Sequence, residues 1–283
     1  MRDAFQYCEN LVRDGDKDRF LATLFASADR RGALHALYAF NLEIARISGA
    51  VQEPMAGGIR LQWWCDVIEG KRDDEAGGHP VACALCDVIR RYALPLHLIE
   101  TLIDARRHDV SGEPILRLDD FETHLRDTCA TLVDLASRIL VPDGDEAEWA
   151  FATPVGLSVG IVEALRALGF HAARGDLSLP GELLARHGVD PHDVLAGRTN
   201  AGLAAALAEL RDRAGLHYEA ARKSIAGAPK AAMAAWLPVA LVPAWLRALD
   251  RQRDAPFAIV EVPQWRRQWD LWRAARRGGP QRR

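Results

Sequence analysis

The chain has 283 residues, of which 49% are hydrophobic and 27% are charged, and its formal net charge at pH 7 is −3. This composition excludes a disordered or fibrous chain and is typical of a globular protein. No apolar run approaches the roughly 20 residues that span a bilayer, and charged residues follow Met1 where a signal segment would be apolar. We therefore expect neither a secreted nor an integral membrane protein.

Helix-forming residues dominate the sequence, with 47 Ala and 35 Leu against 36 Val, Ile and Thr together. This bias predicts an all-α protein. Apolar residues recur with helical spacing from Leu34 to Ile47 and from Leu61 to Ile68. Further helices are expected over 79–92, 95–110, 118–140, 146–168, 200–225 and 231–253, separated by Gly and Pro. Because no linker divides the chain, we expect one domain over 1–264 followed by a tail over 265–283.

Several kinds of chemistry have no sequence signal here. Cys83 and Cys86 form a C-x-x-C pair, but no second pair completes a zinc site. Glycine patterns for dinucleotides or for phosphate are absent, as is the nucleophile elbow of hydrolases. Residues 1–264 carry 29 basic and 38 acidic residues. Nucleic acid is therefore not an expected partner, because its phosphates need a continuous basic surface.

Five segments resemble, in the right order, the landmarks of the squalene/phytoene synthase family. They are DRFLATLFASADRRGALHALYAF at 18–40, RLQWW at 60–64, HPVACAL at 79–85, LIDARRHDV at 102–110 and RGDLSLP at 174–180. The resemblance implies an all-α, single-domain, isoprenoid-synthase-like bundle with a central cavity between its helices.

The metal-binding motifs of that family are altered in this chain. Its enzymes hold Mg²⁺ with a D-x-x-x-D motif on each of two helices, and a spacing of four puts both carboxylates on one helix face. The resemblance places these positions at Ala45 and Gly49 on the first helix and at Ala167 and His171 on the second. It therefore implies a chain without catalytic residues at these positions, without a bound metal and without a cofactor.

The segments AFNLEIARIS, RLQWW, GIVEALRALGFHAARGDLSLP and HGVDPHD resemble a branch of the family formed by assembly factors of mitochondrial respiratory complex I. This resemblance implies a non-catalytic assembly or lipid-handling factor for respiratory complex I, whose partners would be complex I subunits or assembly intermediates. The alternative is an active, diverged prenyl transferase that binds a prenyl diphosphate with Mg²⁺. Whether the chain is an enzyme stays open at this point.

Candidate site residues follow from the same resemblance. An anionic lipid or a prenyl diphosphate would be held at the cavity mouth, because guanidinium groups suit phosphate. The candidates for that role are Arg46, Arg60, Arg166, His171 and Arg174. The candidates for the cavity wall are Phe40, Asn41, Glu43, Trp63, Trp64 and Glu163. Core packing of the aromatic residues and surface ion pairs of the arginines are the alternative interpretations.

The tail over 265–283 contains seven Arg and one Asp. Trp265, Trp269 and Trp272 share one helical face, and Arg266 and Arg273 lie beside it, a composition typical of helices at membrane interfaces. We expect a cytoplasmic protein whose tail is a candidate contact with the inner face of the membrane. The alternative is that the Trp stripe docks on the protein itself.

Overall fold

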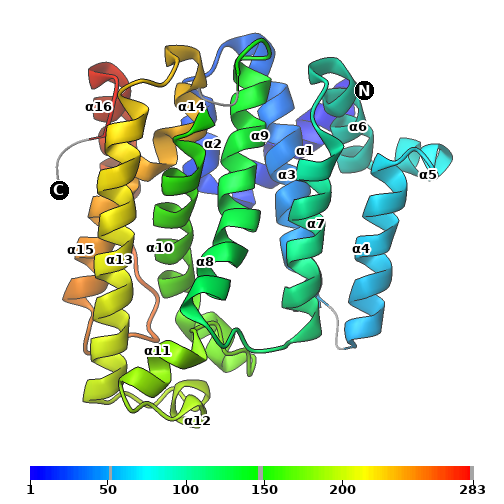
Figure 1. The fold of residues 1–283 in the computed structure, drawn as a ribbon. Helices are drawn as coiled ribbons and strands as arrows, with labels where there is room; N and C mark the ends of the chain where they lie inside the picture. Colours follow the sequence, from blue (N-terminus) through cyan, green and yellow to red (C-terminus); the bar gives the residue numbers. More distant parts are fainter. Residues whose placement is uncertain (51–52, 146–148, 281–283) are drawn as a thin grey trace. The chain divides into compact units, whose positions relative to one another are not determined.

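The computed structural model describes residues 1–50, 53–145 and 149–280 (Figure 1). These residues form helices joined by short turns, and no strand occurs in the part of the chain so described. The all-α fold predicted from the composition is confirmed.

The chain forms two compact units, each built from three separate segments. Unit 1 comprises Met1–Gly112, Thr131–Ala150 and Gly227–Pro238, and unit 2 comprises Glu113–Ala130, Phe151–Ala226 and Val239–Arg283. The helices of unit 1 are α1 (Arg2–Gly15), α2 (Lys17–Thr23), α3 (Ala28–Ala50), α4 (Pro54–Ile68), α5 (Asp73–Gly78), α6 (Pro80–Tyr92), α7 (Leu96–Ser111), α9 (Thr131–Leu140), η3 (Lys230–Ala232) and α14 (Met233–Trp236).

The helices of unit 2 are α8 (Leu118–Leu125), the π-helical turn η1 (Arg126–Ala130), α10 (Ala152–Ala173), α11 (Gly181–Arg186), α12 (Pro191–Leu195), α13 (Ala201–Ile225), α15 (Val242–Arg251) and α16 (Gln264–Arg277). The short 3-10 segment η4 (Leu237–Leu241) spans the boundary between the units. The prediction of a single domain over 1–264 stays a prediction.

Helix α3 is the centre of unit 1. It packs against α1, α6, α7 and α9, and its residues from Ala33 to Asn41 are all buried. The predicted stripe from Leu34 to Ile47 therefore lies in a helix that is covered on several sides along its first half. Toward its C-terminal end the helix becomes more exposed, and this end carries part of the site described below.

Helix α10 is the centre of unit 2, where it packs against α13, α15, α8 and η1. Two of its glycines allow close approach to other backbone. A Cβ atom at Gly156 would lie 2.3 Å from Ala130 Cα, and one at Gly169 would lie 2.0 Å from the carbonyl oxygen of Phe257. Both distances are far below van der Waals contact, so any side chain at these positions would have to displace backbone.

Two of the predicted helices are wrong in their extent or continuity. The helix expected over 146–168 begins at Ala152 and continues to Ala173, and residues 146–148 lie outside the described residues. The helix expected over 231–253 is divided into η3, α14, η4 and α15. Pro238 and Pro243 lack the N–H group that a continuous helix needs, which accounts for the interruption. The helix expected over 118–140 is present but contains the π-helical turn η1.

Among the residues that the structure describes, two helical segments are long and apolar enough to cross a membrane by length and composition, namely Ala152–Ala173 and Lys230–Arg251. This finding differs from the expectation that no apolar segment approaches the length that spans a bilayer. Within the structure, 56% of the first apolar window and 89% of the second are buried. Core helices of globular proteins have this same character, because a helix that is covered on all sides is apolar all round.

Candidate functional site

A pocket of about 440 Å³ in unit 1 brings together several of the predicted residues. It is formed by the C-terminal half of α3, by α4 and by the residue that precedes α6. Its lining residues are Glu43, Arg46, Ile47, Ala50, Arg60, Trp63, Trp64 and His79. Five of these were candidates from the sequence, and His79 is an addition.

Aromatic rings form one wall of this pocket. Trp63 and Trp64 meet edge to face with ring centroids 5.1 Å apart, and His79 lies 5.2 Å from the first ring and 5.5 Å from the second. Beneath them Phe40 packs edge-on against Trp64 at 5.0 Å. Trp64 is 4% exposed, whereas Trp63 is half-buried. The Trp pair therefore fits both interpretations, core packing and a cavity wall, because Trp64 belongs to the core and both rings line the pocket.

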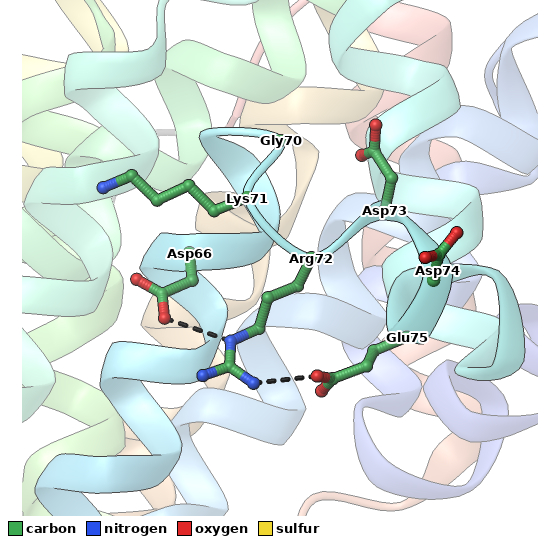
Figure 2. Close-up of a pocket in the computed structure, with 7 residues that line it drawn as sticks. All are labelled: Asp66, Gly70, Lys71, Arg72, Asp73, Asp74 and Glu75. Carbon is green, nitrogen blue, oxygen red and sulfur yellow. Dashed lines mark hydrogen bonds and ion pairs between the residues drawn. The ribbon is translucent and has the colours of Figure 1, made fainter.

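The indole of Trp63 is held in place by a residue of α5. Its Nε1 donates a 2.7 Å hydrogen bond to Glu75. Figure 2 shows how Arg72 bridges from Glu75 to Asp66. Figure 2 also shows the pocket at the junction of α4 and α5, which is lined by Asp66, Gly70, Lys71, Arg72, Asp73, Asp74 and Glu75. These ion pairs are exposed, so their contribution to stability is small, but they restrict the orientation of the Trp63 ring.

Glu43 and His79 face each other in the pocket, with Oε2 3.4 Å from Nε2. His79 Nδ1 accepts a hydrogen bond from the backbone N–H of Ala82 and so caps the N-terminus of α6. The neutral imidazole therefore carries its proton on Nε2, toward Glu43. Burial lowers the pKa of His79, which keeps the ring neutral at pH 7.

Burial also raises the pKa of Glu43 to about 7, against a smaller opposing effect of the Arg46 guanidinium. An ionised carboxylate loses part of its hydration in this position, because its side chain is only 22% exposed. Glu43 is thus a carboxyl group that changes charge near neutral pH at the floor of the pocket.

Two exposed arginines, Arg46 and Arg60, line the same pocket. Arg46 lies over Gly15 at the end of α1, where a Cβ atom would come within 2.6 Å of its Nη2. Guanidinium groups recognise carboxylate or phosphate oxygens, and an aromatic wall accepts an apolar chain. The arrangement therefore suits a ligand with an anionic head and an apolar part.

Replacing Glu43 by Gln is expected to change the pH dependence of stability. For a carboxyl group whose pKa is raised in the folded state, the folded state holds its proton longer than the unfolded state, so stability is lost as pH rises from about 4.5 to about 7. The amide of the variant removes this loss and keeps an acceptor for His79. After allowance for the partial exposure of the group, the variant should gain about 1 to 2 kcal/mol relative to wild type between pH 4 and pH 8.

Urea unfolding of both proteins across this pH range measures the effect. The exposed Glu261 provides a matched control, because Glu261→Gln removes the same charge in a different environment. A stability difference for Glu43→Gln that does not vary with pH would contradict the account of Glu43.

The other predicted residues of α3 differ in how deeply they are buried. Phe40 is fully buried, and Asn41 is 8% exposed with its Oδ1 buried and without a hydrogen-bond partner among the residues that the structure describes. Ala45 is half-buried and Gly49 is exposed. Neither of these last two lines the pocket.

The candidates on α10 and just beyond it belong to unit 2. Arg166 lies over the ring of Trp245 on α15, with Cζ 3.5 Å from the ring centroid, so its guanidinium serves helix packing. Asp176 Oδ2 lies 3.9 Å from His171 Nδ1 and 3.6 Å from Arg174 Nε. Glu163 and Ala167 are half-buried. These contacts favour a structural role for the arginine at 166.

The tail folds as helix α16, and its three tryptophans are exposed. Trp265 is 68%, Trp269 51% and Trp272 41% exposed, whereas Leu271 and Ala274 are buried. Arg266 lies 3.8 Å from Asp270, and Arg273 is half-buried. The helix therefore docks on its unit through Leu271 and Ala274 and not through the Trp stripe.

The residues at the positions where the family resemblance places the metal motifs do not fit magnesium. Ala45, Gly49 and Ala167 have no ligand atom in their side chains, and His171 offers nitrogen where Mg²⁺ prefers oxygen. Across residues 1–50, 53–145 and 149–280, no three His, Cys, Asp or Glu side chains are grouped so as to hold a metal ion.

The sequence defines the family of this protein, and solved structures share its fold. A crystal structure of a dehydrosqualene synthase with a bound ligand superimposes with a TM-score of 0.80, covering 96% of this chain and 95% of that one at 17% identity. The sequence pattern of squalene/phytoene synthases matches residues 12–273, and the chain belongs to that family.

Among individual relatives, complex I assembly factor 6 of Rattus norvegicus is 28% identical over 249 residues, which cover 88% of this chain and 74% of the rat protein. The chloroplastic phytoene synthase 1 of Arabidopsis thaliana is 25% identical over 207 residues, which cover 69% of this chain and 47% of the plant protein. The resemblance inferred from short motifs is thus confirmed over most of the chain.

Proposed function

We propose that this protein is a non-catalytic member of the squalene/phytoene synthase family that supports the assembly of respiratory complex I. The observation that carries the proposal is the similarity to assembly factor 6 along most of both chains. The match to a synthase of the same family is shorter and covers less than half of that enzyme.

The side chains at the motif positions support the non-catalytic part of the proposal. Prenyl transfer in this family ionises an allylic diphosphate, and the leaving diphosphate needs Mg²⁺ held by carboxylates. Ala45 and Gly49 on α3 and Ala167 on α10 cannot supply them. Among the carboxyl groups of α3, that of Glu43 is the nearest in sequence to Ala45 and Gly49. Burial raises the pKa of Glu43 to about 7, so about half of the Glu43 carboxyl groups are protonated near pH 7.

The pocket on α3 and α4 favours a second candidate function, that of a diverged prenyl transferase. Its aromatic wall and its two exposed arginines suit a prenyl diphosphate, and Mg²⁺ would enter with that ligand. The same chemistry suits a lipid phosphate, which an assembly factor could bind without transforming it. Formation of a condensation product separates the two functions, and binding alone does not.

Deletion of the chain in its source organism tests the role in assembly. We expect the content of assembled complex I on native gels to fall several-fold, together with NADH oxidation by isolated membranes. Re-expression of the wild-type chain should restore both. Normal complex I content in the deletion strain would contradict the proposed role, whatever the state of other respiratory enzymes.

A further inference from the structure

Helix α16 has two faces on nearly opposite sides. At about 100° per residue, Trp265, Trp269 and Trp272 fall within an arc of about 60°, and Leu271 and Ala274 lie across the helix from them. The latter two residues are 0% and 1% exposed. The helix is therefore fixed by its inner face, and the tryptophans point away from the unit that carries them.

The inner face is anchored by a second contact within unit 2. Arg267 on α16 places its Cζ 5.9 Å from the ring centroid of Trp245, the same ring that Arg166 on α10 covers. Trp245 is itself 4% exposed. Because the inner face has these partners, exposure of the tryptophans is a property of the docked helix and not of a loose one.

The outer face consists of large aromatic rings with basic residues. The rings of Trp269 and Trp272 are stacked at 5.0 Å, and Arg276 lies 5.1 Å from the centroid of Trp272. By helical position Arg276 falls within the Trp arc. We call the surface formed by Trp265, Trp269, Trp272 and Arg276 the outer face of α16.

The charge of α16 is strongly positive, although that of the whole chain is −3. The helix contains five Arg and one Asp, and that residue, Asp270, has a side chain that is 19% exposed and lies near Arg266. Arg276 and Arg277 are exposed. The outer face thus presents apolar area and positive charge without a facing carboxylate on its own helix.

We propose that the outer face of α16 binds the surface of a bilayer that contains anionic phospholipids. Tryptophan is favoured at the head-group level because its ring is apolar and its N–H group can stay hydrated. Each arginine near an anionic surface is attracted to it, and this attraction weakens as salt screens it. Binding of this face to a bilayer does not require a role of the chain in complex I assembly.

Co-sedimentation of the full chain with vesicles tests this proposal. We expect binding to vesicles of phosphatidylcholine and phosphatidylglycerol at low ionic strength, weaker binding at high ionic strength, and little binding to phosphatidylcholine alone. The triple variant Trp265→Ala, Trp269→Ala, Trp272→Ala should bind at least tenfold more weakly. Leu216→Ala removes another exposed apolar side chain of unit 2, at 74% exposure, and should bind as wild type does.

A charge variant gives a second measurement that does not touch the tryptophans. Arg276→Gln with Arg277→Gln should weaken binding about fivefold for each arginine removed. The control Arg251→Gln with Arg253→Gln removes the same charge from exposed positions at the end of α15 and should have a smaller effect. Circular dichroism checks that every variant is folded.

Three outcomes would overturn the proposal. The triple Trp variant could bind vesicles as wild type does, which would place the contact elsewhere. The wild-type chain could bind neutral and anionic vesicles equally or bind neither. Sedimentation velocity could show a dimer that the triple variant converts to a monomer, without vesicle binding, which would assign the outer face to self-association.

Discussion

Gly156→Ala is expected to lower the free energy of unfolding by about 3 kcal/mol, because the added methyl group would overlap the backbone of η1. Its Cβ atom would lie 2.3 Å from Ala130 Cα and 2.4 Å from Ala130 N. Flexible side chains can move away from such a contact, but the backbone of a helix packed in a core cannot do so without shifting its neighbours. Urea unfolding monitored by far-UV circular dichroism measures the change.

Gly58→Ala is the matched control for this substitution. Gly58 also lies in a helix, but a Cβ atom there would meet nothing within 4 Å. Alanine should then stabilise the protein by about 0.5 to 1 kcal/mol through its better helix propensity. If Gly156→Ala were as stable as wild type, the close packing of α10 on η1 would be incorrect.

The periodic helices were predictable from the sequence because their signals are local. The helix expected over 200–225 is α13, Ala201–Ile225, and Asn200 caps it through a hydrogen bond from the N–H of Leu203. A polar capping residue before an apolar pattern is visible without any structure. The same holds for the start of α6, where Pro80 stands at the first helical position.

The pocket was only partly predictable, because it depends on contacts between distant residues. The family motifs indicate Arg46, Arg60 and the Trp pair, whereas the sequence indicates His79 only as the start of the helix expected over 79–92. Its imidazole has two roles: Nδ1 accepts the hydrogen bond from Ala82, and Nε2 lies opposite Glu43. The cap position gave a signal for the first role. Nothing local indicates the second, since the two side chains lie far apart in the sequence.

The orientation of the tail could not be predicted for a different reason. A helix with a Trp stripe and a weaker Leu271–Ala274 stripe can dock by either face, and the larger apolar stripe is the usual one to be buried. In the structure the smaller residues are buried, and Arg267 adds its contact with Trp245. Which face of α16 is buried depends on the shape of the unit 2 surface on which it packs, and the sequence of α16 alone does not specify that shape.

We expect the purified chain to form no squalene, dehydrosqualene or phytoene, although its fold is that of enzymes that make such products. The non-catalytic part of the proposed function is supported by the side chains at the positions where the family resemblance places the metal motifs, because these side chains cannot take the place of the carboxylates. Restoring transfer would require oxygen ligands on both α3 and α10, and a single carboxyl group such as Glu43 does not provide them. We therefore expect this chain to form no condensation product at all, and not merely less product than an active synthase.

The most direct measurement incubates the purified chain with farnesyl or geranylgeranyl diphosphate, Mg²⁺ and NADPH, and analyses the extracted hydrocarbons by mass spectrometry. An active synthase of the family in a parallel reaction is the positive control, and the same synthase mixed with this chain shows that no inhibitor is present. We expect unchanged diphosphate and no condensation product from this chain alone. A C30 or C40 product that depends on this chain and on Mg²⁺ would contradict the proposed non-catalytic function.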